Sequence, residues 1–179
     1  MKKAKSKKMT KNQYLVEVSL LIAFSYLGSL IKIQGTIALD ALPAYFGALL
    51  LGPLAGAIVG FLGHLLTAMT SGFPMTLPLH LFIASSMAVT VWLFGYAAEK
   101  VNLTFAILVG ALFNGPISTL VASYLAALLG LGFSGKTMFI GLVIPLTLTS
   151  LMNILGGITL YKAVGRYIGL EKTHEISRS

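Results

Sequence analysis

Long apolar segments alternate with short polar breaks along most of this chain. A helix needs about 20 apolar residues to cross the hydrocarbon core of a bilayer. The pattern predicts six membrane helices, at about residues 14–31, 40–51, 54–70, 77–98, 103–129 and 138–161. Two of the breaks, Gly52-Pro53 and the stretch 71–74, contain the glycine and proline that end helices. We therefore expect an all-α integral membrane protein, a compact bundle of six transmembrane helices.

The second of these helices is short for a membrane span. Either this helix begins before residue 40, or it is too short to cover its part of the site. Asp40 stands at its start and could act as a helix N-cap, since aspartate accepts hydrogen bonds from the free N–H groups of a first turn. A role as a ligand-binding residue is the alternative, and the sequence leaves both open.

Composition supports a membrane location. The chain is 56% hydrophobic and only 10% charged, whereas a soluble domain carries about 25% charged residues. It has no cysteine, which excludes disulfides and thiolate metal sites. The net charge of +8 does not predict nucleic-acid binding, because six of the thirteen basic residues are lysines within the first eleven positions. Such a cluster suits a cytoplasmic tail beside anionic lipids.

The basic residues also predict the orientation. With six spans and both termini in the cytoplasm, only Lys32 and Lys136 of the thirteen basic residues fall outside, as the positive-inside rule requires. We expect a basic cytoplasmic tail at residues 1–13, a six-helix substrate-binding domain at 14–165 and a cytoplasmic tail at 166–179. The protein should lie in the plasma membrane of a prokaryote as a multi-pass protein.

One motif suggests a different class of protein. Residues 130–137, Gly-Leu-Gly-Phe-Ser-Gly-Lys-Thr, match the P-loop pattern GxxxxGK[ST] in full. A P-loop needs a buried strand before it, and the preceding residues 123–129 are typical of the end of a membrane helix. We interpret the segment as an outer loop without nucleotide chemistry.

Polar side chains inside the predicted helices are the candidate binding residues, since ionisable groups within a membrane are often functional. His64 follows Gly52, Gly56 and Gly60 at four-residue spacing, so all four share one helix face. We interpret the glycines as a packing groove. For His64, a ligand contact and an ordinary interhelical hydrogen bond remain equal alternatives.

Two asparagines near the middle of helices also need partners. An amide costs several kcal/mol in hydrocarbon unless it is hydrogen-bonded, so Asn114 and Asn153 should face the interior of the bundle. Pro116 removes a backbone donor beside Asn114, and broken helices at this depth are tolerated where they line a cavity. The polar groups are mostly uncharged, which suits a neutral or weakly charged heterocycle better than an inorganic ion.

Catalysis and metal binding find little support. The sequence has no His-Glu-x-x-His run and no paired aspartates for magnesium. His64, His80 and His174 do not share a helix face. We expect no enzyme activity, no metal and no cofactor. A self-sufficient carrier or channel, and an intramembrane enzyme acting on lipids, remain as less favoured alternatives.

Taken together, residues 14–161 resemble the substrate-binding S components of energy-coupling factor (ECF) vitamin transporters. Two features support the resemblance most strongly. One is the short second helix followed by residues 50–57, Leu-Leu-Gly-Pro-Leu-Ala-Gly-Ala, and the other is a face of small residues on the first helix. In that family an Ala-x-x-x-Ala face on this helix docks on the transmembrane coupling subunit. The matching positions here are Ser19 and Ala23, with serine a conservative departure.

The resemblance implies a division of labour with partner subunits. The S component binds a vitamin from outside with high affinity, while the transmembrane coupling subunit and two cytosolic ATPase subunits drive uptake. Residues 32–40 and 71–76 would be the loops that cover the site. The expected substrate-binding residues come from both these loops and the helices: Gln34, Thr36, Asp40, Tyr45, His64, Phe73, His80, Asn114, Ser118 and Asn153.

The motifs at residues 35–40, 63–68, 72–74 and 77–80 look most like those of the cobamide-related members. The resemblance therefore implies alpha-ribazole or cobalamin as the first candidates for the substrate. Pantothenate or another water-soluble vitamin remains an alternative.

Overall fold

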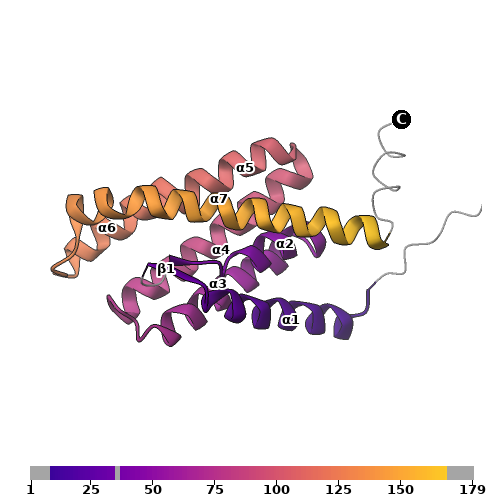
Figure 1. Cartoon of the computed structure of the whole chain (residues 1–179), viewed down its shortest axis with the longest axis horizontal. Coiled ribbons are helices and arrows are strands. Elements are labelled where there is room, and N and C mark those ends of the chain that lie inside the picture. The colour runs from indigo at the N-terminus through magenta and orange to yellow at the C-terminus, as the bar shows by residue number, and fades with distance from the viewer. Residues whose placement is uncertain (1–8, 35–36, 169–179) are drawn as a thin grey trace, which may run out of the picture.

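The computed structural model describes residues 9–34 and 37–168. Within these residues the chain is helical apart from one small antiparallel hairpin (Figure 1). In order, the elements are α1 (Lys11–Ser29), β1 (Lys32–Gln34), β2 (Ile37–Ala38), α2 (Leu42–Leu50), α3 (Pro53–Thr70), α4 (Leu77–Lys100), α5 (Leu103–Leu112), the π-helix η1 (Phe113–Ile117), α6 (Ser118–Leu128) and α7 (Gly135–Ile168).

The chain passes back and forth between two ends of the bundle. α1 begins and α7 ends at one end, on the right in Figure 1, where α2 also turns into α3. The β1–β2 hairpin and the turns between α3 and α4 and between α6 and α7 lie toward the other end. Because α5, η1 and α6 form one continuous rod, Leu103–Leu128 is a single segment of 26 residues.

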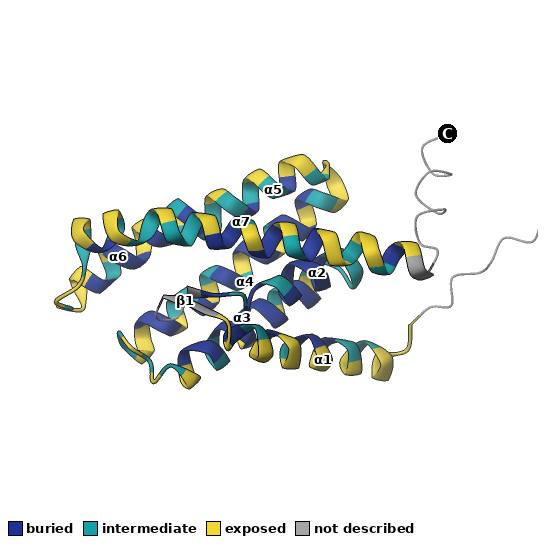
Figure 2. Ribbon diagram, viewed as in Figure 1, coloured by how far each residue is buried: buried dark blue, intermediate teal, exposed yellow. Residues whose placement is uncertain are grey.

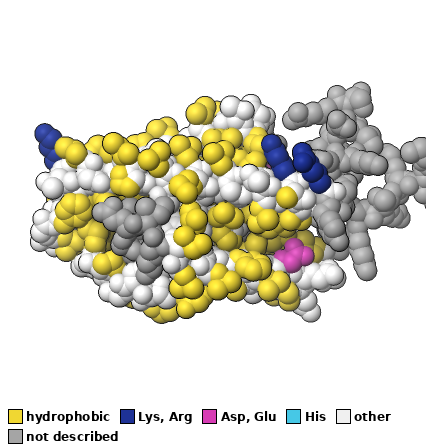
Figure 3. Space-filling view, viewed as in Figure 1, with side chains coloured by type: hydrophobic (Ala, Val, Ile, Leu, Met, Phe, Trp, Pro, Cys, Tyr) yellow, Lys and Arg dark blue, Asp and Glu magenta, His cyan; other side chains and the backbone are white. Residues whose placement is uncertain are grey.

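Four helical segments are long and apolar enough to cross a membrane: Pro53–Thr70, Leu77–Lys100, Leu103–Leu128 and Gly135–Arg166. Their outward faces are largely exposed (Figure 2). Large apolar side chains lie there, among them Leu108 and Ile144, which are 62% and 66% exposed. Charged side chains visible on the face in Figure 3 lie at the two ends of the bundle, and the surface between them is largely hydrophobic. This arrangement is that of a multi-pass membrane protein.

The short helix α2 lies in the centre of the bundle. Ala44 and Tyr45 are fully buried, and α2 contacts α1, α3, α4 and α7. Small residues on its neighbours allow the close approach: a Cβ added at Gly56 would lie 2.5 Å from Ala48 Cβ, and one at Gly157 would lie 2.9 Å from Tyr45 Cβ. The glycines of α3 therefore serve packing, as the sequence indicated.

A helix lies in each of the six predicted ranges, with shifted ends, although α1 and α2 are not among the four segments long and apolar enough to cross a membrane. Of the two roles left open for Asp40, the structure does not support the helix cap. Asp40 does not cap α2, because the N-cap position is Ala41 and no side chain bonds the first turn. The polar break after α1 forms the hairpin, which covers the bundle where α2 is too short to do so. α1 begins before its apolar stretch because Thr10 and Gln13 form a reciprocal capping box.

Candidate functional site

A pocket opens between the hairpin, α3, α4, the η1–α6 segment and α7. Its empty space, including open solvent at its mouth, amounts to about 780 Å³. Half of the lining side chains are polar and half apolar: Ala38, Asp40, Ala41, His64, Met75, His80, Ile83, Met87, Asn114, Ser118, Thr119, Ala122, Met138, Leu142, Leu146, Thr149, Ser150 and Asn153. No Lys or Arg is among these described lining residues.

Asp40 is held rigidly in the wall of this pocket. Its carboxylate Oδ2 accepts a hydrogen bond from Thr67 Oγ1 at 2.6 Å. Its backbone carbonyl accepts one from the Ser25 hydroxyl of α1. Both serine and threonine are fully buried. The segment between the hairpin and α2 is thereby tied to α1 and α3, and the buried carboxylate faces the pocket in one fixed position.

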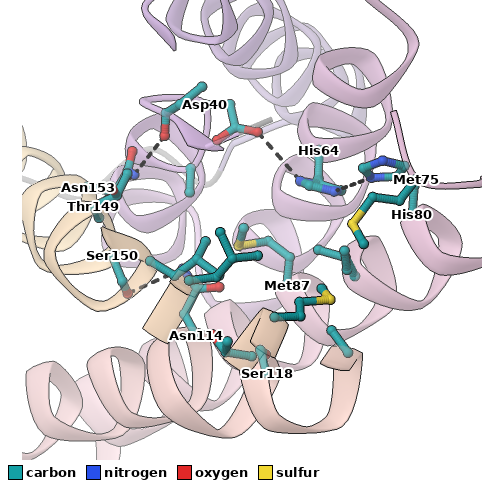
Figure 4. Close-up of a pocket in the computed structure, with 18 residues that line it drawn as sticks. Asp40, His64, Met75, His80, Met87, Asn114, Ser118, Thr149, Ser150 and Asn153 are labelled. Carbon is teal, nitrogen blue, oxygen red and sulfur yellow. Dashed lines mark hydrogen bonds and ion pairs between the residues drawn. The ribbon is translucent and has the colours of Figure 1, made fainter. Parts of the chain in front are cut away.

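Two histidines extend this polar wall (Figure 4). His64 Nδ1 lies 3.8 Å from Asp40 Oδ2, and His64 Nε2 lies 3.3 Å from His80 Nδ1. A carboxylate beside Nδ1 favours the tautomer that carries the proton on that nitrogen. In that tautomer His64 Nε2 is the acceptor and His80 Nδ1–H the donor of the contact between the two rings. Asp40, His64 and His80 form one chain of polar contacts across the hairpin end, α3 and α4.

The opposite wall consists of neutral polar groups from η1, α6 and α7. Asn114 Nδ2 donates to Ser150 Oγ at 3.2 Å, and the hydroxyls of Ser118 and Ser86 lie 2.5 Å apart. Asn153 Nδ2 donates to the carbonyls of Ala38 and Thr149 at 3.2 and 3.0 Å. Asn114 therefore joins the broken helix to α7, and Asn153 joins α7 to the hairpin.

The broken helix is what brings Asn114 to the pocket. Pro116 has no N–H to donate, so residues 113–117 adopt π geometry between two α-helical segments. Gly115 is buried and contacts Thr147 of α7 so closely that an added Cβ would lie 2.6 Å from its Oγ1. Proline and glycine together allow η1 to approach α7 and present the asparagine side chain.

Apolar side chains line the space between the two polar walls. Met75, Met87 and Met138 all line the pocket, with Ile83 and Leu142 beside them. Methionine adapts its shape readily and makes favourable contacts with aromatic rings. The pocket can therefore enclose an apolar or aromatic ring while polar groups bind its edges.

The structure brings six of the ten predicted substrate-binding residues together at this pocket: Asp40, His64, His80, Asn114, Ser118 and Asn153. Tyr45 is fully buried beneath it and packs edge-on against Phe94, with ring centroids 4.9 Å apart. The Phe73 ring lies 5.9 Å from that of His80 without lining the cavity. Thr36 and the Gln34 side chain lie outside the described residues.

Phe73 reaches His80 through an unusual backbone. Gly72 and Phe73 both have positive φ, 73° and 48°, and their N–H groups bond the carbonyls of Met69 and Ala68, which closes α3 with a Schellman motif. A positive φ is strained for phenylalanine. This fixed turn holds the aromatic ring beside the histidine pair.

Some lining residues were not among the predicted ones. Thr149 and Ser150 share a helix face with Asn153, at spacings of four and three residues. The periodicity of α7 could therefore have identified them. Nothing in the local sequence distinguishes Met75, Met87 and Met138 from ordinary core residues, because their place in the pocket depends on how three separate segments pack.

Other predicted features can also be placed. Ser19 and Ala23 are exposed on α1, away from the buried face formed by Val18, Leu21 and Ser25. The segment 130–137 follows helix α6 directly, so it lacks the strand that a P-loop requires. Among the described residues, no group of three or more His, Asp or Glu side chains is placed to hold a metal ion.

Comparisons with known proteins agree with this architecture. Residues 13–165 match the family described as "ECF transporter, substrate-specific component". A solved structure described as "Structure and mechanism of the S component of a bacterial ECF transporter" is similar in fold, with a TM-score of 0.59 and 18% sequence identity. The alignment covers 89% of this chain and 99% of that one. None of the curated proteins searched matches the chain.

The fold is that of a membrane-embedded substrate-binding component. The chain belongs to the family of substrate-specific components of ECF transporters. As a member of this family it serves transport, and its partners are of the kind shared by these components, an ECF transmembrane subunit with an ATPase module.

Proposed function

We propose that this chain binds a water-soluble vitamin or vitamin precursor with high affinity and delivers it to an ECF transmembrane coupling subunit with two cytosolic ATPase subunits. The observation that carries the proposal is the pocket, whose polar residues come from five separate elements and surround an apolar centre. A site that needs so many elements in register binds a specific small molecule better than it conducts a stream of solutes.

The proposed topology has six passes with both termini in the cytoplasm of a prokaryotic cell. α1 beginning and α7 ending at the same end supports this (Figure 1). α2, with nine residues, reaches only about 13 Å, so the hairpin and α2 would complete the second pass together. The pocket would then open toward the outside, beside the hairpin and the α3–α4 turn.

Among vitamins, we place alpha-ribazole or cobalamin first. A ligand with a carboxylate, such as pantothenate, would need a cationic or strongly donating partner, and no described lining residue is Lys or Arg. Alpha-ribazole combines a flat apolar ring with an uncharged sugar, which suits methionines between neutral polar walls. Cobalamin carries a corrin ring in addition, so the size of the pocket favours the smaller compound.

Transport in proteoliposomes tests the proposal. Vesicles containing this chain with its coupling subunit and ATPases should accumulate alpha-ribazole when ATP is enclosed on the cytoplasmic side. Vesicles with this chain alone should bind the compound without accumulating it. Uptake by the chain alone would support a self-sufficient carrier instead.

A further inference from the structure

Two lining residues of the pocket each retain a buried polar atom without a hydrogen-bond partner. They are His80, through Nε2, and Asn153, through Oδ1. The two residues are 1% and 2% exposed, so neither atom is solvated from the surface. A buried polar group left unpaired is unfavourable, and a correctly placed ligand would remove that penalty.

The chemistry of the Asn153 atom is fixed by its neighbours. The other side-chain atom, Nδ2, donates to two backbone carbonyls, those of Ala38 and Thr149. The reversed amide would direct its oxygen at both carbonyls, which repel it. Oδ1 is therefore the unpaired atom, and an amide oxygen can only accept a hydrogen bond.

The chemistry of the His80 atom follows from the chain of contacts behind it. The position of Asp40 assigns the His64 proton to Nδ1, the nitrogen that faces the carboxylate, and in that tautomer His64 Nε2 accepts from His80 Nδ1–H. A neutral His80 that donates through Nδ1 has a lone pair on Nε2. The Asp40 carboxylate thus makes His80 Nε2 an acceptor through the intervening His64 ring.

We propose that the ligand of this pocket supplies two hydrogen-bond donors, hydroxyl or N–H groups, to His80 Nε2 and Asn153 Oδ1. The two acceptors belong to α4 and α7, on opposite walls of the pocket, with the methionine-lined space between them (Figure 4). The ligand is then a neutral molecule whose apolar ring lies among the methionines and whose donors are at two separate points. The inference rests on the proposed function and narrows its substrate class.

The test pairs changes in the protein with changes in the ligand. The ligands are alpha-ribazole and its 2′-, 3′- and 5′-deoxy analogues. Each analogue lacks one hydroxyl donor of the parent compound and is otherwise identical to it. Their dissociation constants are measured by calorimetry with the unmodified protein, His80→Phe, Asn153→Leu and Ser123→Ala. Ser123 is the matched control, because its hydroxyl is also buried and unpaired while the residue does not line the pocket.

With the unmodified protein, removal of either of two of the hydroxyl groups should weaken binding at least tenfold. In His80→Phe, removal of one of these two hydroxyls should no longer weaken binding, and in Asn153→Leu the same should hold for the other hydroxyl. In Ser123→Ala both removals should weaken binding as they do in the unmodified protein. A variant that merely disturbs the fold weakens all four ligands by one factor and leaves their ratios intact.

Equal binding of the four ligands, or unchanged ratios in both variants, would overturn the two-donor inference and leave the proposed function standing. The proposed function fails by a different result, namely that no vitamin or precursor binds at all. If another vitamin binds in place of alpha-ribazole, the same comparison is made with that vitamin and its O- or N-methylated forms.

Discussion

His64 Nε2 and His80 Nδ1 lie 3.3 Å apart, which joins α3 to α4 at the wall of the pocket and makes each imidazole depend on the other. Because Asp40 lies on the far side of His64, the hairpin end of the bundle, α3 and α4 act as one binding surface.

Replacing His64 or Asn114 with alanine should weaken ligand binding at least tenfold while the protein remains folded. Each change removes a lining side chain that also holds another one, His80 in the first case and Ser150 in the second. Thermal unfolding establishes that each variant is folded, and calorimetry measures its affinity. Unchanged affinity in both variants would remove these residues from the site.

Thr67→Val should destabilise the protein by about 1–2 kcal/mol, because it leaves the buried Asp40 carboxylate without its 2.6 Å donor. Thr70→Val is the matched control on the same helix, since the Thr70 hydroxyl bonds only backbone carbonyls of its own helix and the residue is exposed. Unfolding by denaturant in detergent compares the two. Equal effects would show that Thr67 does not support the carboxylate.

Gly115→Ala should destabilise the bundle by about 1–3 kcal/mol. Its new Cβ would lie 3.1 Å from the Thr147 backbone Cα as well as 2.6 Å from the hydroxyl, so α7 must move. Gly141→Ala adds the same atom to α7 at an exposed position with an ordinary 3.5 Å contact, and should be neutral or stabilising. The melting temperatures of the two variants are compared. An unchanged melting temperature in Gly115→Ala would contradict the close packing of η1 against α7.

Ala23→Trp should block assembly with the coupling subunit and leave ligand affinity unchanged. The residue is exposed on α1, and a large side chain would separate a docking face built on small residues. Leu108→Trp places the same bulk on the exposed face of α5 and should assemble normally. Co-purification with the coupling subunit measures the outcome, and normal assembly of the Ala23 variant would argue against docking at this face.

The helices could be predicted because lipid requires long apolar segments, and their ends were less predictable because they depend on local contacts, such as the capping box at Thr10. The hairpin could not be predicted from the break at residues 32–36, since a two-stranded pairing depends on what it covers. In the same way, Asp40 has the sequence context of a helix cap. Only the position of α3, which brings Thr67 and His64 to its carboxylate, gives it a different environment.

The site was predictable where polar residues interrupt apolar helices, because such groups must find partners inside the bundle. His64, His80, Asn114 and Asn153 follow this rule and line the pocket. Tyr45 satisfies the same sequence criterion but lies below the cavity, against Phe94. The position of Tyr45 along the sequence does not determine whether its side chain faces the cavity or the opposite side of α2.

The most direct test of the account is ligand-induced thermal stabilisation of the purified chain in detergent, measured against a panel of vitamins and their precursors. Binding to the folded state alone stabilises it by about 4 kcal/mol at a thousandfold excess over the dissociation constant. The account predicts a clear rise in melting temperature with alpha-ribazole, lost in His64→Ala. A rise with a different vitamin would retain the binding function and change the substrate, whereas no rise with any member of the panel would contradict the central claim.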